Sequence, residues 1–468
     1  MNRFLLRLTG PDASTLAARL MKTAARTRLP AAAWQLEEGF VFSCGAAEAG
    51  EVEYRSLTAS MHQGGNTWKL PRDRFSSMID AAAGAMLNIA GHTPIGKGIG
   101  GDFEAGYEYA RANWPTLGRA PQASADPLIA IDGETAIAMA LIASGCGYFA
   151  ASAGAPASKA RALLHSKSPR GRVRIVEAGD AVAAAFSAAG AGYGGIRAAA
   201  EVPHERELLG APGASWAASA EVPFVLLVSE PGSPESFGGI VRAPASIREV
   251  YRHIVEAFDL AESYQTSATI IIEPALRSRW ETIVEPTAPP TLHRGRWVVP
   301  SNGAPFDRYA LTEDGISPRS APGMAGLEHS TNAIEGDDSP RRKARFEKLS
   351  RKDGSLREAI GPGPVLGPDK ETVLVARGAV AAALRGPVEA GEIPCGLLPV
   401  RTLRPFAAKE IAGRLFGKRI FVAAERSDDA LLRLLRSDAG LDVTWWRVSS
   451  TDSSTGMIES LSQVISGG

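Results

Sequence analysis

Two long regions of the chain share one pattern, in which strand-length apolar runs alternate with helix-length amphipathic stretches. In the first region the runs start at Leu128, and the stretches between them predict helices over 134–144, 180–191 and 247–264. Residues 371–468 repeat the alternation on a smaller scale. Strands that alternate with helices of this length are typical of a parallel sheet with helices on both faces. We therefore predict an α/β protein with two such units.

The remaining regions depart from this pattern. Residues 3–8 form an apolar run, a Gly-Pro-Asp turn follows, and the apolar spacing of 16–21 is helical, which together predict a strand, a turn and a helix. The glycines of 91–101 are too dense for a regular element, so we expect a linker or an ordered loop there. Residues 281–368 lose the alternation and gain proline, glycine and charge, which predicts an extended connector.

Charge and cysteine content narrow the class of protein. The chain has 51 basic and 51 acidic side chains and no net charge, so no long-range field favours nucleic acid or an anionic membrane as a partner. Its three cysteines lie far apart, without the close spacings that hold zinc or an iron–sulfur cluster. No apolar run is long enough for a signal peptide or a membrane span. We therefore expect a cytoplasmic protein without a metal site or cluster of its own.

Five segments carry a resemblance to a known family. They are DGETAIAMALIASGCGYFAAS, VRIVEAGDAVAAAF, AESYQTSATIIIE, the connector segment DRYALTEDGISPRSAPG, and CGLLPVRTLRPF. In these segments the chain resembles the α subunits of 2-oxoacid:ferredoxin oxidoreductases, the family of the pyruvate and 2-oxoglutarate enzymes. The likeness covers about residues 103–468, and the connector together with the AESYQT helix end makes it specific.

The resemblance implies four parts. Residues 101–280 would form a pyrimidine-binding domain of the thiamine-diphosphate (ThDP) fold, which is an α/β domain with a parallel sheet. Residues 369–468 would form a second α/β domain like the C-terminal domain of transketolase, and 281–368 would connect the two. Some members of the family carry a γ domain ahead of the α domain, and residues 1–100 are similar to a truncated γ domain, a small α/β region.

The resemblance also implies a cofactor shared between chains. The family oxidises 2-oxoacids with ThDP, a carbanion stabiliser whose diphosphate is held through a metal ion. The sequence lacks the GDG motif and following Asn pair that mark the diphosphate half of such a site. We therefore expect a β subunit to supply this half with its Mg²⁺, to carry any iron–sulfur cluster, and to reach ferredoxin or another acceptor. An α/β heterodimer or a dimer of heterodimers is the expected assembly.

The position of the family's catalytic glutamate is altered. A gapless alignment places Ala181 where the family has the glutamate that activates the pyrimidine ring, and Asp180 and Glu177 are the nearest carboxylates that could replace it. Asp180 also suits a helix N-cap, because a short carboxylate before an Ala-rich helix accepts free backbone N–H groups. Both interpretations stay open, as does loss of ThDP.

Two loops that would contact the cofactor are altered as well. The substrate loop of the family keeps Pro156 and Ser158 here, but Ala155 stands at the position of its threonine. A second loop has become charged and contains His204. This loop is either an exposed remnant of a lost site or a new acid–base cluster, because histidine titrates near neutrality.

The last similar segment contains two arginines, Arg401 and Arg404. The resemblance makes them candidates for binding the anionic groups of coenzyme A (CoA), because guanidinium groups pair with phosphates. An ordinary surface loop is the alternative.

Three functions fit these observations. The first is an α-like subunit of a heteromeric 2-oxoacid:acceptor oxidoreductase, in which a 2-oxoacid and CoA give acyl-CoA, CO₂ and a reduced acceptor. The second is a pseudo-catalytic assembly subunit that has lost the ThDP-activating site. The third is a subunit of a divergent ThDP-dependent decarboxylase or carboligase.

Overall fold

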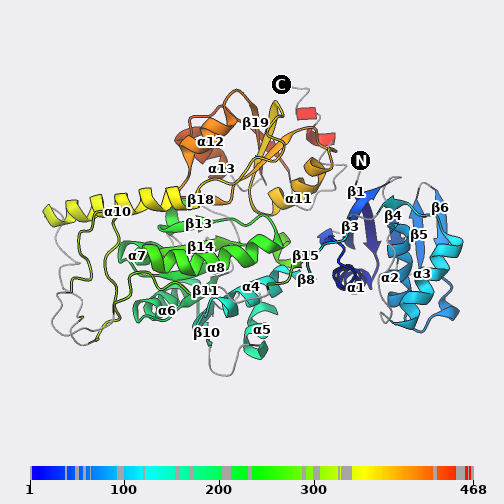
Figure 1. The fold of residues 1–468 in the computed structure, drawn as a ribbon, viewed down its shortest axis with the longest axis horizontal. Coiled ribbons are helices and arrows are strands. Elements are labelled where there is room, and N and C mark those ends of the chain that lie inside the picture. The colour runs from blue at the N-terminus through cyan, green and yellow to red at the C-terminus, as the bar shows by residue number, and fades with distance from the viewer. Residues whose placement is uncertain are drawn as a thin grey trace.

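The computed structural model describes most of the chain, in segments separated by gaps. The described residues are 3–36, 39–47, 52–55, 59–63, 65–91, 100–119, 122–152, 159–167, 173–202, 212–229, 234–286, 291–298, 306–324, 327, 340–424, 430–448, 459–461 and 463–464. Within them, three sheets form the framework (Figure 1). The sheet of the N-terminal region lies at one end of the molecule, and the C-terminal sheet lies above the central one (Figure 1).

The first sheet is mixed and joins the N-terminal region to the middle of the chain. Its strand order is β6-β5-β4-β1-β3-β2-β15-β8, and β7 pairs with β3. The strand, turn and helix predicted at its start are confirmed as β1 and α1. The elements are β1 (Arg3–Thr9), α1 (Ala13–Arg26), β2 (Ala32–Leu36), β3 (Gly39–Ala47), β4 (Val52–Arg55), β5 (Ser60–Gln63), β6 (Asn66–Lys69), η1 (Arg72–Arg74), β7 (Gly118–Arg119), β8 (Leu128–Asp132) and β15 (Trp280–Val284).

Two further helices, α2 (Met78–Ile89) and α3 (Gly101–Asn113), pack against each other in this region (Figure 1). Their backbones touch at Gly84, where a Cβ atom would lie 2.0 Å from the carbonyl oxygen of Phe103. Glycine inside a helix costs about 1 kcal/mol relative to alanine, so the close contact explains its presence. Helix α3 thus packs with the N-terminal region, and the domain limits at 100, 280 and 368 stay predictions.

The second sheet forms the centre of the molecule. Its strand order is β10-β9-β11-β12-β14-β13-β18, and every pair except β13–β18 is parallel. Helices α6 and α7 pack on one face, and α4 and α8 pack on the other, each face with its own apolar core. The α/β class predicted for the chain is thereby confirmed. The elements are α4 (Gly133–Ala143), β9 (Tyr148–Ser152), α5 (Lys159–Lys167), β10 (Arg174–Ala178), α6 (Ala181–Tyr193), β11 (Ala198–Val202), α7 (Pro212–Ser219), β12 (Phe224–Val228), η3 (Pro234–Phe237), β13 (Ile240–Arg242), α8 (Ile247–Tyr264), β14 (Ser267–Ile271), α9 (Pro274–Ser278) and β18 (Thr402–Arg404).

Two strands differ from the prediction. The apolar run at β8 was expected in the parallel sheet, but β8 pairs antiparallel with β15 and extends the first sheet. That expectation was wrong because an apolar run does not specify its pairing partner, which long-range packing selects. Strand β11, with the sequence AAAEV, was not predicted, because alanine has a low strand propensity. Its burial between β9 and β12 outweighs this propensity.

The connector contains a helix that its sequence did not predict, α10 (Pro340–Ile360). The helix is rich in charge, and lysines occupy its buried face. Lys348 donates a hydrogen bond of 2.7 Å to buried Glu221, and Lys352 donates one of 3.2 Å to the same carboxylate. Burial would raise the pKa of Glu221, but Lys352 and Lys348 outweigh it and hold the pKa below the usual 4.5.

Neither α10 nor any other described helix has the length and apolar run needed to cross a membrane.

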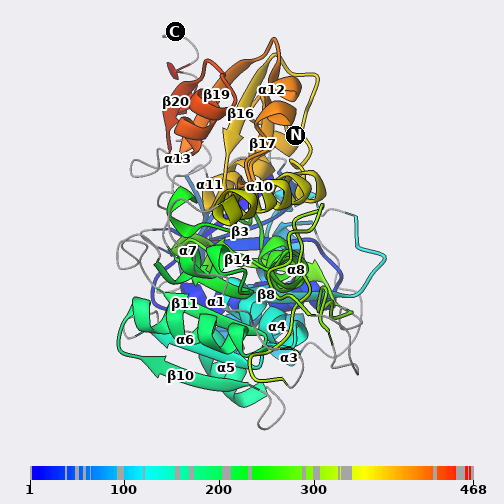
Figure 2. The ribbon, with the colours of Figure 1, turned by 90° about the vertical axis from the view of Figure 1, so that its left-hand side faces the viewer.

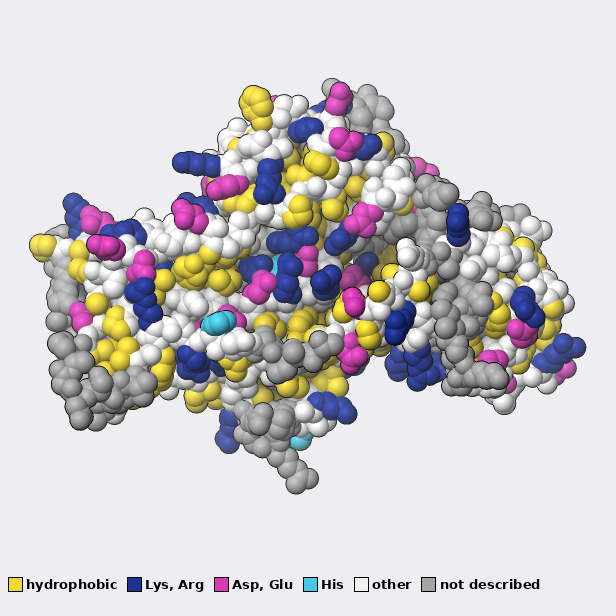
Figure 3. Space-filling view, viewed as in Figure 1, with side chains coloured by type: hydrophobic (Ala, Val, Ile, Leu, Met, Phe, Trp, Pro, Cys, Tyr) yellow, Lys and Arg dark blue, Asp and Glu magenta, His cyan; other side chains and the backbone are white. Residues whose placement is uncertain are grey.

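The third sheet is parallel, with the order β17-β16-β19-β20. Strand β18 leaves this unit and pairs with β13 of the central sheet. We call this junction between the central and C-terminal units the seam. Two ion pairs cross it, Arg401 with Glu249 (2.6 Å) and Arg377 with Glu273 (3.2 Å). Figure 2 shows α10 passing between the two units, and Figure 3 shows side chains of both charges gathered along their junction. The elements are β16 (Thr372–Ala376), α11 (Gly378–Glu389), β17 (Gly396–Pro399), α12 (Ala408–Leu415), β19 (Arg419–Ala424), α13 (Ala430–Arg433), the π-helical η5 (Leu434–Asp438) and β20 (Thr444–Arg447).

Candidate active site

The candidate site lies at the carboxyl edge of the central sheet, where β10, β9 and β11 end side by side. Ligands of open parallel sheets bind beyond this edge. Glu177 of β10, Ala151 of β9 and Glu201 of β11 form one row, because each pairs in register with the next. Neighbouring strands lie about 4.8 Å apart, so the backbones of the two glutamates are about 10 Å apart.

Glu177 is the accessible carboxylate of this row. Its side chain is 73% exposed, because β10 is the edge strand of the sheet, and it forms an ion pair of 3.6 Å with Arg161 of α5. An exposed pair of this kind contributes about 0–1 kcal/mol to stability. Glu177 can therefore exchange Arg161 for a ligand at little cost.

Asp180 and Ala181 begin α6, and their side chains have different surroundings. The carboxylate of Asp180 accepts a hydrogen bond of 2.7 Å from the backbone N–H of Ala183, which is the arrangement of a helix N-cap. Ala181 is buried in the apolar core between α6 and the sheet. A glutamate at position 181 would point into that core, whereas the side chain of Glu177 is exposed.

Glu201 belongs to a buried ion cluster that the sequence did not reveal. Arg277 of α9 donates hydrogen bonds of 2.6 Å to Glu201 and 2.7 Å to Glu134 of α4. Burial disfavours the charged guanidinium, but Glu201 and Glu134 outweigh it and raise the pKa of Arg277. Glu134 also accepts a hydrogen bond from the backbone N–H of Ala160, at the start of α5. Through Glu134, Arg277 thus links the carboxyl end of β11 to the start of α5.

Two buried hydroxyl groups at the same edge have no hydrogen-bond partner among the described residues. Ser152 ends β9 and Ser229 directly follows β12, and both side chains are buried. A buried hydroxyl without a partner costs about 1–3 kcal/mol, a cost that a bound ligand can offset. The sequence offered no signal for either. Among the predicted site residues, Pro156, Ser158 and His204 lie outside the described part of the chain.

The described residues supply no metal centre. No group of three or more His, Cys, Asp and Glu side chains among them could hold a metal ion. The edge of the sheet presents the exposed carboxylate of Glu177, which can hydrogen-bond a heterocycle, whereas Ser152 pairs in register with Ala178 and its buried side chain faces the opposite side of the sheet. The described residues thus offer one exposed carboxylate for a hydrogen bond and lack the donor set for a metal-bound diphosphate.

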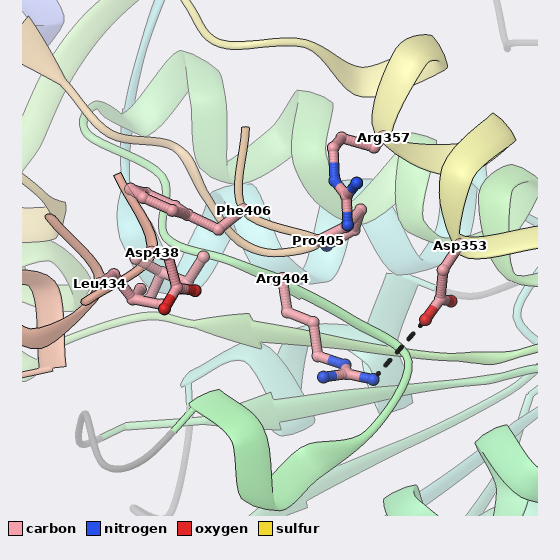
Figure 4. A pocket seen from close by; sticks show the side chains of 8 residues that line it. Asp353, Arg357, Arg404, Pro405, Phe406, Leu434 and Asp438 are labelled. Carbon is pink, nitrogen blue, oxygen red and sulfur yellow. Dashed lines mark ion pairs between the residues drawn. The ribbon is translucent and has the colours of Figure 1, made fainter. Parts of the chain in front are cut away.

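The two arginines proposed for CoA have separate environments. Arg401 pairs with Glu249 at the seam between the central and C-terminal units. Arg404 lines a cavity of about 160 Å³ together with Arg357, Phe406 and Asp438 (Figure 4). Its ion pair with Asp353 is long, at 3.8 Å, and both side chains are more than one-third exposed. Arg404 is therefore available to an anionic ligand, whereas Arg401 is committed to the seam.

The chain shares its fold with a solved oxidoreductase structure. The solved structure of 2-oxoglutarate:ferredoxin oxidoreductase from Magnetococcus marinus, with 2-oxoglutarate, coenzyme A and succinyl-CoA bound, has the same architecture. It matches with a TM-score of 0.78 over 100% of this chain and 99% of that chain, at 16% sequence identity. This similarity concerns the fold.

Relatives by sequence are α subunits of 2-oxoacid:ferredoxin oxidoreductases. The protein of that name from Sulfurisphaera tokodaii is 26% identical over 360 residues, which are 67% of this chain and 57% of the relative. The protein from Saccharolobus solfataricus is 25% identical over 345 residues, which are 64% of this chain and 55% of the relative. The chain thus matches little more than half the length of these relatives, and no protein-family model matches it. The resemblance drawn from the sequence motifs is confirmed.

Proposed function

We propose that the chain is the α-like subunit of a heteromeric 2-oxoacid:acceptor oxidoreductase. A 2-oxoacid would be oxidatively decarboxylated with CoA, and a β subunit would share the ThDP and pass electrons to ferredoxin or another acceptor. The observation that carries this proposal is the exposed carboxylate of Glu177 at the carboxyl edge of the central parallel sheet. The sequence similarity to α subunits of such enzymes supports it.

Glu177 is the residue to which we assign the pyrimidine. When bound, ThDP supplies the electron sink for decarboxylation of a 2-oxoacid. Glu177 would hydrogen-bond a pyrimidine ring nitrogen and exchange a proton there. A carboxylate this exposed needs a covering chain to exclude water from the reaction, as closed active sites do. We therefore assign the cover, the Mg²⁺ site and any iron–sulfur cluster to the β subunit.

The cavity beside Arg404 is the proposed docking point for CoA. Pockets that enclose drug-sized ligands measure about 300–1,000 Å³. The volume of about 160 Å³ here suits one phosphate group rather than a whole nucleotide. Arg404 and Arg357 would pair with that phosphate, and Phe406 lines the other side of the cavity, next to Asp438 (Figure 4).

Two alternatives remain, and one observation favours the first of them. The carboxylate of Asp180 is engaged as the N-cap of α6, and Ala181, at the position of the family's glutamate, is a buried residue without a carboxylate. Both observations fit an assembly subunit that has lost the activating site. The second alternative is a non-oxidative ThDP decarboxylase or carboligase.

A reconstituted complex separates these functions. The full chain would be co-expressed with a candidate β chain that carries the diphosphate and metal motif, and the purified complex assayed for bound ThDP and for CoA-dependent oxidation of pyruvate and 2-oxoglutarate. We expect bound ThDP in proportion to the α/β pairs and acyl-CoA that forms together with a reduced acceptor. A well-folded complex without ThDP would favour the assembly subunit. CO₂ release without reduction of any acceptor would favour the decarboxylase or carboligase.

A further inference from the structure

His253 is buried inside the molecule without a hydrogen-bond partner. It lies on α8, its side chain is 0% exposed, and neither ring nitrogen has a partner among the described residues. A neutral imidazole has one N–H donor and one acceptor nitrogen, and a buried polar group that lacks a partner is destabilising. The apolar core around α8 therefore gives no reason for a histidine at this position.

The position of His253 on α8 puts it between two ion pairs at the seam. Glu249 precedes it by four residues and Glu256 follows it by three, and residues at these spacings are neighbours on a helix surface. Glu249 pairs at 2.6 Å with Arg401, which leads into β18. Glu256 pairs at 2.5 Å with Arg242 of β13. Because β13 and β18 are the strands that join the two units, His253 lies behind the junction that they form.

The charges that act on His253 are positive. Burial comes first, and with the charges of Arg242, Arg252 and Arg401 it holds the pKa of His253 well below the usual 6.5. The two carboxylates on the same face of α8 are both held by arginines. The other elements that pack on α8 carry charged side chains with ion pairs of their own, namely Glu134 of α4, Asp353 of α10, Arg385 of α11 and Glu281 of β15.

We propose that the seam is a pH-sensitive junction that opens in acid, because His253 can bind a proton only when the seam is open. In the closed seam an imidazolium would be buried among three arginines without an acceptor for its N–H groups. An exposed histidine binds a proton near pH 6.5. The open state thus holds one more proton than the closed state, and the equilibrium constant for opening should rise about tenfold for each pH unit below about 6.5.

Opening of the seam would change the cavity beside Arg404. Asp353 and Arg357 of α10 line one part of this cavity, and Phe406 and Asp438 of the C-terminal unit line another. Arg404 belongs to β18, which the pairing with β13 holds in place. Loss of that pairing would displace Arg404, so an anion bound in the cavity should be released in acid. This consequence concerns any anionic ligand and does not depend on the proposed function.

The test follows opening of the seam in the full chain by hydrogen exchange. The probe is the backbone amide of Ala243, which donates a hydrogen bond of 2.9 Å across the seam to the carbonyl oxygen of Arg401. After correction for the pH dependence of the intrinsic rate, its exchange should accelerate about tenfold per pH unit from pH 6.5 to 5. Amides of β12 and β16, inside the two units, should not show this acceleration.

Variants without a titrating group at position 253 identify the cause. His253→Leu stays neutral at every pH and should abolish the acceleration at Ala243. His253→Gln is the second neutral variant, for use if the leucine disturbs folding. His165→Leu is the matched control, because His165 is exposed on α5 and lies away from the seam, and it should keep the acceleration.

Three outcomes would overturn the proposal. One is wild-type exchange at Ala243 that does not accelerate in acid. Another is acceleration that persists in a folded His253→Leu or His253→Gln chain. The third is equal acceleration at Ala243 and in β12, which would mean that acid unfolds the central unit as a whole and does not open the seam.

Discussion

Glu177 and Glu201 occupy the same row of the central sheet, two strands apart, and differ in almost every other respect. Glu177 lies on the edge strand with one exposed ion pair, and Glu201 lies inside the sheet, fully buried against Arg277. The exposed carboxylate is held weakly and can be recruited by a ligand. The buried Glu201 stabilises the charged Arg277 beside it, because a buried charge that loses its partner is costly. Position in the strand order therefore separates a candidate catalytic acid from a structural one.

The largest expected effect follows from removing Arg277. Arg277→Met would remove the guanidinium that pairs with both Glu134 and Glu201, and breaking a buried pair costs about 3–5 kcal/mol. Urea denaturation should show a loss of this size in the free energy of unfolding. Arg161→Met, which removes the partner of Glu177, is the matched control and should cost less than about 1 kcal/mol. Equal losses in the two variants would contradict the distinction between the two glutamates.

Glu177→Gln should affect activity and not stability. If Glu177 exchanges a proton with the pyrimidine ring, the amide should lower the rate of 2-oxoacid oxidation by the reconstituted complex about 100-fold or more. The free energy of unfolding should change by less than about 0.5 kcal/mol, because the side chain is exposed. Full activity of this variant in a ThDP-loaded complex would rule out the proposed role.

Loss of the Asp180 side chain should have a smaller effect, on stability rather than on the catalytic rate. Asp180→Ala removes the hydrogen bond to the N–H of Ala183, and loss of an N-cap costs about 1 kcal/mol. Asp180→Asn keeps an acceptor oxygen and should cost only a few tenths of that amount. Both should leave the catalytic rate of the complex unchanged. A rate that falls as far with Asn as with Ala would instead make Asp180 a catalytic carboxylate.

The smallest expected effect concerns acid pH and the buried pair of Glu221 with the lysines of α10. Because the pKa of Glu221 is lower in the folded state than its usual 4.5, its contribution to stability is complete above pH 4.5. It should be lost as the pH falls through the lowered value, because the unfolded chain binds the proton more readily. Urea denaturation at a series of acid pH values should show this decline in wild type. The decline should be weaker in Glu221→Gln, and identical pH profiles would contradict the assignment.

The elements were predictable where local pattern governs them. Helix α8 covers the residues 247–264 that its apolar spacing predicts, because one amphipathic face packs on the sheet. Helix α10 was missed because its buried face holds Lys348 and Lys352 beside Leu356, and the partner of the lysines, Glu221, lies more than a hundred residues away in the sequence. Strand β11 was missed because its alanines favour a strand only when neighbouring strands enclose it.

The candidate site was predictable only in part. Glu177 and Asp180 were recognisable as carboxylates near the start of a helix, and the N-cap role of Asp180 follows from that local position. Glu201 and Arg277 lie 76 residues apart, so no local pattern joins them. Their pairing depends on α9 meeting the end of β11.

The amino-acid pattern was sufficient for the alternation of strands and helices, the connector motif and the likeness to α subunits, because each depends on residues close together along the chain. Three-dimensional packing decided which glutamate faces outward, which arginine remains available to an anionic ligand and which histidine is buried among arginines. Strand order puts β10 at the edge and β11 inside, and the seam with the C-terminal unit engages Arg401 but leaves Arg404 beside a cavity. These distinctions arise from contacts between segments far apart in sequence, which hydrophobic periodicity does not encode.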